Sequence, residues 1–199
     1  MKKIIALLLV LTMAMGLIAC GNGGNTDTTT TPETTEGITN TGASGSALEI
    51  LETVWNGVPE DNRFFAMGGD MNNMVDNAPG NFSLTDEGLT ATLLVPADQI
   101  ANLDQAASLV HGMNLNNFTC GVYHVAEGGD VVGFADAMYE AISNNRWMCG
   151  FPEKMLIAVI DESYVLVAFG INDAMAPVEA SFATAYAAAE VKYNEAIAG

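Results

Sequence analysis

The chain has 199 residues with 24 acidic and 6 basic side chains, which gives a formal net charge of −18. Lys2 and Lys3 lie in an N-terminal segment that we expect to be removed, so the mature chain is still more acidic. This balance excludes nucleic acid as a partner, because phosphates need basic side chains. It also excludes attachment to anionic lipid by charge. The length is sufficient for one domain with its own core.

The first twenty residues have the organisation of a bacterial export signal. Lys2 and Lys3 precede an apolar run over residues 4–18, which is shorter than the roughly 20 apolar residues that span a bilayer. The run ends in Leu17-Ile18-Ala19-Cys20-Gly21. This ending resembles the lipobox of bacterial lipoproteins. The resemblance implies that residues 1–19 are a lipoprotein signal peptide, and that Cys20 carries the lipid that anchors the protein to the extracytoplasmic face of the cell membrane. The alternative is an ordinary secretory signal whose cleavage site contains a cysteine.

Residues 20–46 are predicted to be the lipidated cysteine and a flexible tether. Residues 21–46 are mostly Thr, Gly and Asn with almost no apolar side chains, so they cannot bury enough surface to offset the entropy of ordering. A flexible coil of 26 residues reaches roughly 28 Å root-mean-square. We therefore expect a folded domain at residues 47–199, held away from the membrane.

The pattern of apolar residues predicts an α+β domain. Ser46 and Glu49 form a capping box before an amphipathic helix, and residues 57–82 read as a long loop or an irregular strand pair. The remaining predicted elements follow in chain order: helices at 83–94 and 97–103, strands at 108–115 and 118–125 joined by Asn116-Asn117, a helix at 130–145, a hairpin of 155–160 and 164–169, and a last helix from Asp173 through Tyr193. We expect an antiparallel sheet of about four strands (two hairpins), covered by helices on one face.

The span from Thr119 to about Ala185 resembles small surface lipoproteins of Gram-positive anaerobes. In these proteins a strand such as Tyr123-His124-Val125 leads into an amphipathic helix. A strand such as Tyr164–Ala168 then leads into a C-terminal helix. Segments 97–99 and 146–152 are similar to proteins of this kind that are labelled "bacteriocin transport accessory protein". The resemblance implies the fold and the compartment, and it suggests a role in the export of, or immunity to, secreted peptides.

Cys120 and Cys149 are predicted to form a disulfide, because exported domains with two cysteines commonly contain one. The strand from Phe118 to Val125 runs about 26 Å, and the helix from Asp130 to Arg146 returns by about 25 Å. Cys149 should therefore return close to Cys120, and the bridge would add roughly 3.5 kcal/mol of stability. The alternative is two free thiols.

Soft-metal binding is the main alternative to a plain binding function. Met67, Met71 and Met74 lie within eight residues of a Gly/Asn-rich segment, and thioethers prefer Cu(I). His111 with Met113, and Cys120 with His124, share strand faces. Methionine is also an ordinary core residue, so these residues are only candidates and no cofactor is predicted.

No catalytic set is visible in the sequence. The segment Trp147–Lys154 faintly resembles a thioredoxin active site, but that chemistry requires two cysteines two residues apart, and position 152 is proline. GxSxG, GxGxxG and GxxxxGK[ST] motifs are also lacking. The sequence therefore predicts a non-enzymatic, lipid-anchored module that binds an extracytoplasmic protein or small ligand.

Overall fold

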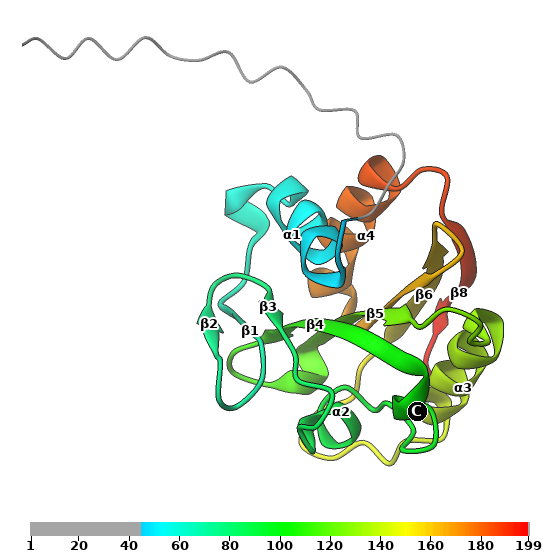
Figure 1. The fold of residues 1–199 in the computed structure, drawn as a ribbon. Helices are drawn as coiled ribbons and strands as arrows, with labels where there is room; N and C mark the ends of the chain where they lie inside the picture. Colours follow the sequence, from blue (N-terminus) through cyan, green and yellow to red (C-terminus); the bar gives the residue numbers. More distant parts are fainter. Residues whose placement is uncertain (1–44, 199) are drawn as a thin grey trace, which may run out of the picture. The chain divides into compact units, whose positions relative to one another are not determined.

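The structure is a computed structural model, and it describes residues 45–198. This part of the chain has an α+β fold, in which an antiparallel sheet of eight strands has four α-helices packed against it. The strand order is β2-β1-β4-β5-β7-β6-β8, and β3 pairs additionally with β4. Figure 1 shows α1 and α4 on one side of this sheet and α2 and α3 on the other.

The elements have the following bounds. The helices are α1 (Ala47–Gly57), α2 (Gly88–Ala91), α3 (Val131–Ser143) and α4 (Asn172–Ala185), with short 3-10 turns η1 (Glu60–Asn62), η2 (Ile100–Asn102) and η3 (Leu115–Asn117). The strands are β1 (Ala66–Gly68), β2 (Val75–Asp76), β3 (Gly80–Asn81), β4 (Leu103–His111), β5 (Phe118–Val125), β6 (Lys154–Ile160), β7 (Tyr164–Gly170) and β8 (Glu190–Ala196).

Helices cover both faces of the sheet, so the prediction of helices on one face is wrong. Along β7, residues 164, 166 and 168 belong to the core beneath α1 and α4. Residues 165, 167 and 169 belong to a second core, to which α2 and α3 contribute. Every residue of β7 is buried. A strand buried on both faces reads as a continuous apolar run instead of alternating, and β6 and β7 have that character.

The sheet is also larger than the four strands predicted. The two predicted hairpins are present as β4–β5 and β6–β7. The segment 57–82 adds β1, β2 and β3 beside β4, as three strands of two or three residues each. At the other edge, β8 pairs with β6. The expectation of an irregular strand pair in 57–82 is therefore close to the structure, although it undercounts the strands.

The C-terminal helix ends earlier than predicted. We expected the helix to continue to Tyr193, but α4 ends at Ala185 and residues 190–196 form β8. The alanine-rich sequence favours helix, but β6 is apolar along its length and would otherwise expose its outer edge. Pairing with β8 satisfies the backbone groups of that edge, and this tertiary gain outweighs local helix propensity.

Two further predictions were wrong in extent. The helix expected at 83–94 is only the four-residue α2, and it is followed by Leu94 in a left-handed conformation with φ of 59°. The helix expected at 97–103 is only the 3-10 turn η2, and β4 begins at Leu103 instead of residue 108. The capped helix α1 is confirmed: the Ser46 side chain accepts a hydrogen bond from the Glu49 amide.

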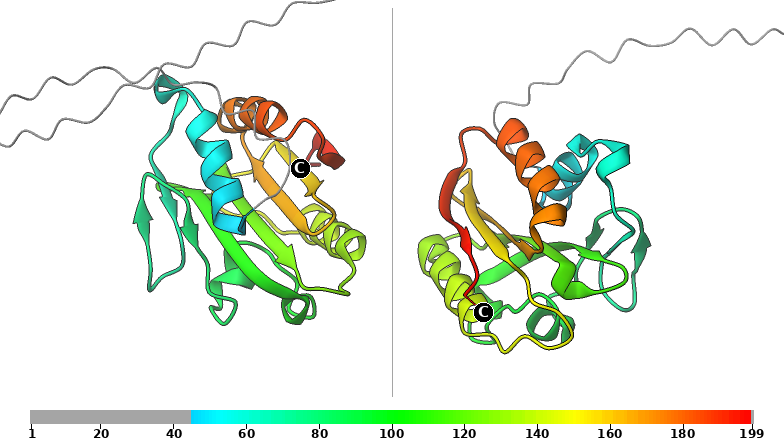
Figure 2. Two further views of the ribbon diagram at one scale, coloured as in Figure 1. Left: turned by 45° about the horizontal axis from the view of Figure 1, so that its top comes forward. Right: turned by 180° about the vertical axis from the view of Figure 1, so that it is seen from behind.

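The two ends of the sheet have different surroundings. The amide of Ala47, at the start of α1, donates to the side chain of Gln105 near the start of β4. The described part of the chain therefore begins at this end of the sheet. The opposite end carries the β4–β5 turn and the connection from α3 to β6, since β4 is antiparallel to β5 and β6 to β7. Figure 2 gives two further views of this arrangement.

Candidate functional site

Cys20 and the signal peptide lie outside the described residues. Within residues 45–198, no helix is long and apolar enough to cross a membrane. The lipid anchor therefore stays a prediction from the sequence.

Cys120 and Cys149 are free thiols, so the predicted disulfide is wrong. The chain after the helix does return to the start of β5, as predicted. The side-chain amide of Asn114, beside the start of β5, donates to the Cys149 carbonyl at 2.8 Å. The prediction failed because it did not account for the face of the sheet to which Cys120 points. The Cys120 side chain points into the core beneath α1 and α4, whereas α3 and the segment after it pack on the other face. Burial raises the pKa of the Cys120 thiol, and Cys149 is exposed.

The three candidate methionines do not share one environment. Met71 and Met74 are 78% and 58% exposed beyond β1, whereas Met67 lies within β1, where it pairs with Val110 of β4. A Cu(I) site needs thioethers that converge on one point. Copper binding therefore stays a prediction. Elsewhere among the described residues, no group of three or more His, Cys, Asp or Glu side chains is placed to hold a metal ion.

Asp70 organises the methionine-bearing loop, a role that sequence reasoning missed. Its carboxylate accepts hydrogen bonds from the amides of Asn72, Asn73 and Ser83 at 2.9–3.1 Å. Burial raises the pKa of the Asp70 carboxyl, but these hydrogen bonds to the ionised form outweigh burial and hold the pKa below its usual value. The Asp-x-Asn-Asn sequence, with an acid just before loop amides, is the signal that predicts such a turn.

Both histidines have local structural partners. His111 accepts a hydrogen bond on Nδ1 from the Met113 amide at 3.1 Å, and its ring stacks on Phe64. His124 Nδ1 lies 2.5 Å from Asp104 Oδ1, and its ring contacts that of Tyr164. These contacts give each histidine a role in positioning neighbouring residues, which is the usual role of a lone strand histidine.

A cluster of exposed apolar side chains lies at the end of the sheet opposite Ser46. We call it the distal apolar surface. Its members come from the β4–β5 turn, from the α3–β6 connection and from the residue before β1: Phe65, Met113, Leu115, Met148 and Phe151. Met113, Met148 and Phe151 are 80%, 77% and 64% exposed. Monomeric proteins seldom expose large apolar side chains together except where they bind another molecule.

Hydrogen bonds hold the two main loops of this surface together. Asn116 Nδ2 donates to the carbonyls of Met148 and Gly150 at 2.7 and 3.0 Å, in addition to the bond from Asn114 to Cys149. These contacts hold Cys149 in a left-handed conformation with φ of 62°, which costs energy for a residue with a Cβ. The Phe65 ring lies against Gly112, where a Cβ would come within 2.4 Å of the ring. The domain's own contacts therefore hold the loops of this surface in one arrangement.

The sequence contains a signal for this surface in the side chains of its two loops. We expected Asn116 in a turn and Asn114 in the strand at 108–115, whereas their side chains join two loops that are 32 to 35 residues apart in the chain. The exposed residues are apolar and lie between polar turn residues, where solvated side chains are the norm. An apolar residue in such a position is the pattern to look for.

Comparisons with protein-family models, with curated proteins and with solved structures give no match to this chain. The resemblance to surface lipoproteins of Gram-positive anaerobes therefore stays a prediction.

Proposed function

We propose that this protein is a lipid-anchored extracytoplasmic module that binds another protein through its distal apolar surface. The observation that carries the proposal is the pair of apolar loops braced by Asn114 and Asn116. Methionine and aromatic residues are enriched in protein interfaces, and methionine adapts its shape to a partner. Because the loops are held in place beforehand, less conformational entropy is lost on binding.

The position of this surface suits an anchored protein. The lipobox at Cys20 and the Thr/Gly/Asn-rich residues 21–46 support anchoring by lipid. The chain then enters the domain at Ser46, whereas the distal apolar surface is at the opposite end of β4. Nine residues of strand separate these ends, which corresponds to about 30 Å. The anchor and the binding surface can therefore be occupied at the same time.

The partner that fits best is a protein with an apolar patch of its own. The acidic excess of the chain opposes both self-association and contact with anionic lipid. Arg146, which is exposed on the α3–β6 connection beside Met148, adds one positive charge at the edge of the surface. A partner with an acidic group beside its apolar patch would complement it. A role in export of, or immunity to, secreted peptides is compatible with this surface but rests on the resemblance alone.

The test is photo-crosslinking in intact cells that express the full chain. A photoreactive phenylalanine at position 151 should give one discrete adduct, and Met113→Ser with Met148→Ser should remove that adduct without changing the amount of protein. The same photoreactive residue at Glu140, on the exposed side of α3, is the matched control and should give none. A Cys20→Ser chain should lose membrane attachment.

The outcomes separate the two parts of the proposal. Equal adducts at positions 151 and 140, or an adduct that survives the double methionine change, would remove the distal apolar surface as a binding site. If the Cys20→Ser protein is processed and still remains in the membrane fraction, the proposal of a lipid anchor at Cys20 is wrong. An adduct of twice the chain's own mass would assign the surface to self-association and overturn the proposed partner.

A further inference from the structure

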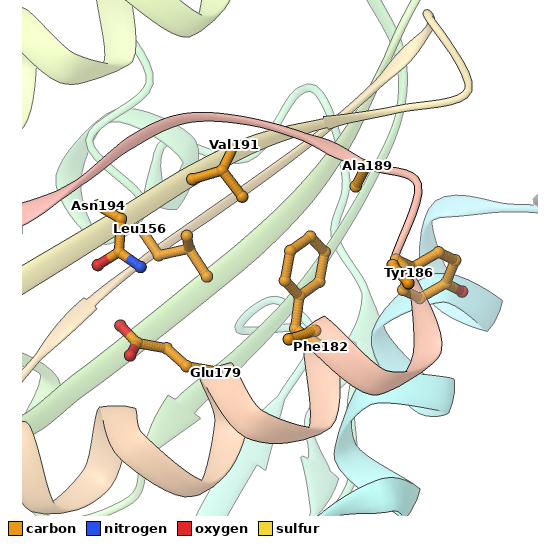
Figure 3. Close-up of a pocket in the computed structure, with 9 residues that line it drawn as sticks. Leu156, Glu179, Phe182, Tyr186, Ala189, Val191 and Asn194 are labelled. Atoms are coloured by element: carbon orange, nitrogen blue, oxygen red, sulfur yellow. The ribbon is translucent and has the colours of Figure 1, made fainter.

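A pocket lies where α4 crosses the β6–β8 edge of the sheet. It has a volume of about 210 Å³ and opens between α4, β6 and β8. Its apolar wall is formed by Leu156 of β6, Phe182 of α4, Val191 of β8 and several alanines. Glu179 and Asn194 contribute the polar groups that Figure 3 shows beside Leu156. The combination of an apolar wall with a few polar groups is typical of small-molecule sites.

Only one oxygen of the Glu179 carboxylate has a hydrogen-bond partner among the described residues. Oε2 accepts a hydrogen bond from Lys154 Nζ at 2.7 Å. Oε1 is buried and has no hydrogen-bond partner among the described residues. Figure 3 shows the carboxylate turned from α4 toward Leu156 and Asn194. A buried carboxylate oxygen without a donor destabilises the fold, and native proteins contain few such groups. Its position at a pocket indicates that a donor on a ligand completes it.

The charge of the site decides which donor fits. Lys154 already balances the charge of Glu179, but the chain as a whole is strongly acidic. A ligand with a carboxylate or phosphate would be repelled by this field, whereas a cation would be attracted. A charged N–H donor also gives a stronger hydrogen bond to carboxylate than a neutral donor does.

The size and lining of the pocket restrict the rest of the ligand. Its volume is below the range of about 300–1,000 Å³ usual for drug-sized ligands, so only a small molecule fits. Phe182 and Leu156 present apolar surface next to the carboxylate, and Ala183 and Ala187 leave the space open because their side chains are short. The ligand body should therefore be apolar.

We propose that the pocket between α4, β6 and β8 binds a small organic ammonium ion, whose N–H group donates to Glu179 Oε1 while its apolar body packs on Phe182 and Leu156. The pocket shares no residue with the distal apolar surface. The protein would then have two separate binding sites, and either can fail in a test without the other.

The experiment uses phenethylamine as the probe, with phenylacetate and 2-phenylethanol as matched anionic and neutral probes. Backbone amide shifts of Ala183, Ala187 and Val191 are followed by NMR in the mature chain carrying Cys20→Ser. Phenethylamine should give saturable shifts, 2-phenylethanol should bind at least about tenfold more weakly because it lacks the charge-assisted bond, and phenylacetate should give none.

Three variants make the assignment specific. Glu179→Gln should weaken phenethylamine binding about tenfold and remove its advantage over 2-phenylethanol, since the charge on the acceptor is lost. Ala183→Leu should block binding by filling the pocket while leaving the carboxylate in place, so it also serves if the Glu179 variant folds poorly. Glu190→Gln is the control, because Glu190 is an exposed carboxylate of β8 that pairs with Lys192. The affinity of this variant for phenethylamine should stay within about twofold of that of the unmodified chain.

Several results would overturn the proposal. Shifts that do not saturate would show that water alone completes Glu179. Equal binding of phenethylamine and phenylacetate would show that the carboxylate does not select the ligand. Unchanged affinity in both Glu179→Gln and Ala183→Leu would place the ligand elsewhere on the protein.

Discussion

The two faces of the sheet are closed to different degrees at the β8 edge. On the α3 face, the Tyr193 ring of β8 stacks on Tyr139 of α3 at 4.2 Å, and its hydroxyl donates to Asp136 at 2.7 Å. On the α4 face, short side chains such as Ala183, Ala187 and Val191 leave a pocket between α4 and β8. The difference shows that the size of a few edge residues decides whether a helix-on-sheet layer closes or leaves a site.

The largest expected effect is the difference in modification rate between a thiol in the buried core and a thiol in an exposed loop. Cys120 is buried beneath α1 and α4 and its pKa is raised, whereas Cys149 is exposed. In the folded Cys20→Ser chain, a thiol reagent should modify Cys149 at once. It should modify Cys120 at least about 10³-fold more slowly, because that thiol reacts only when the domain opens.

Two controls make the thiol result decisive. Cys149→Ser should leave only the slow reaction, and mild denaturant should accelerate it. Equal rates for the two thiols, or an intact mass that corresponds to a disulfide, would contradict the placement of Cys120 and Cys149 on different faces.

Truncating one phenylalanine in each core should sharpen the comparison of the two faces. Phe134 of α3 is fully buried and contacts the ring of Tyr123, so Phe134→Ala should lower the free energy of unfolding by about 4 kcal/mol. Phe182 of α4 borders the pocket, so Phe182→Ala only enlarges an existing opening. Because it creates less new closed cavity, we expect a loss smaller by about 1 kcal/mol or more. Urea unfolding followed by circular dichroism measures both, and a larger loss for Phe182→Ala would show that the α4 face is the tighter one.

The sequence predicted the central elements well because their signals are local. The capping box at Ser46 marked the start of α1, and the apolar runs on either side of residues 161–163 marked the β6–β7 hairpin. The strand β8 could not be predicted in this way. Its residues follow a run of alanines with high helix propensity, and only the partner strand β6, about 35 residues earlier, favours the extended conformation.

The sites were harder to predict than the fold, for a related reason. Chain-length arithmetic placed Cys149 near the start of β5 correctly, but it could not give the face to which Cys120 points. A change of one residue in register reverses that face. The continuous apolar run of β7 is typical of a strand buried on both faces, and the expectation of helices on one face overlooked this signal. The pocket at Glu179 depends on β8, so it could not be anticipated once that strand was interpreted as helix.

The smallest expected effect concerns the closed side of the β8 edge and depends on pH. The hydrogen bond to Asp136, followed by burial, raises the pKa of Tyr193 to about 12, above the value of about 10 for an unfolded tyrosine. A group whose pKa is higher in the folded state stabilises the fold fully below its unfolded pKa, and this stabilisation is lost as pH rises through the folded pKa. Tyr193→Phe should therefore be less stable than the unmodified chain at pH 8, and the difference should shrink between about pH 10 and 12.

Asp136→Asn, which keeps an acceptor but removes the charge, should shift the Tyr193 titration to lower pH in ultraviolet absorbance. A stability difference that stays constant up to pH 12 would show that the Tyr193–Asp136 bond does not close this edge, and the two faces would then differ only in the size of their side chains.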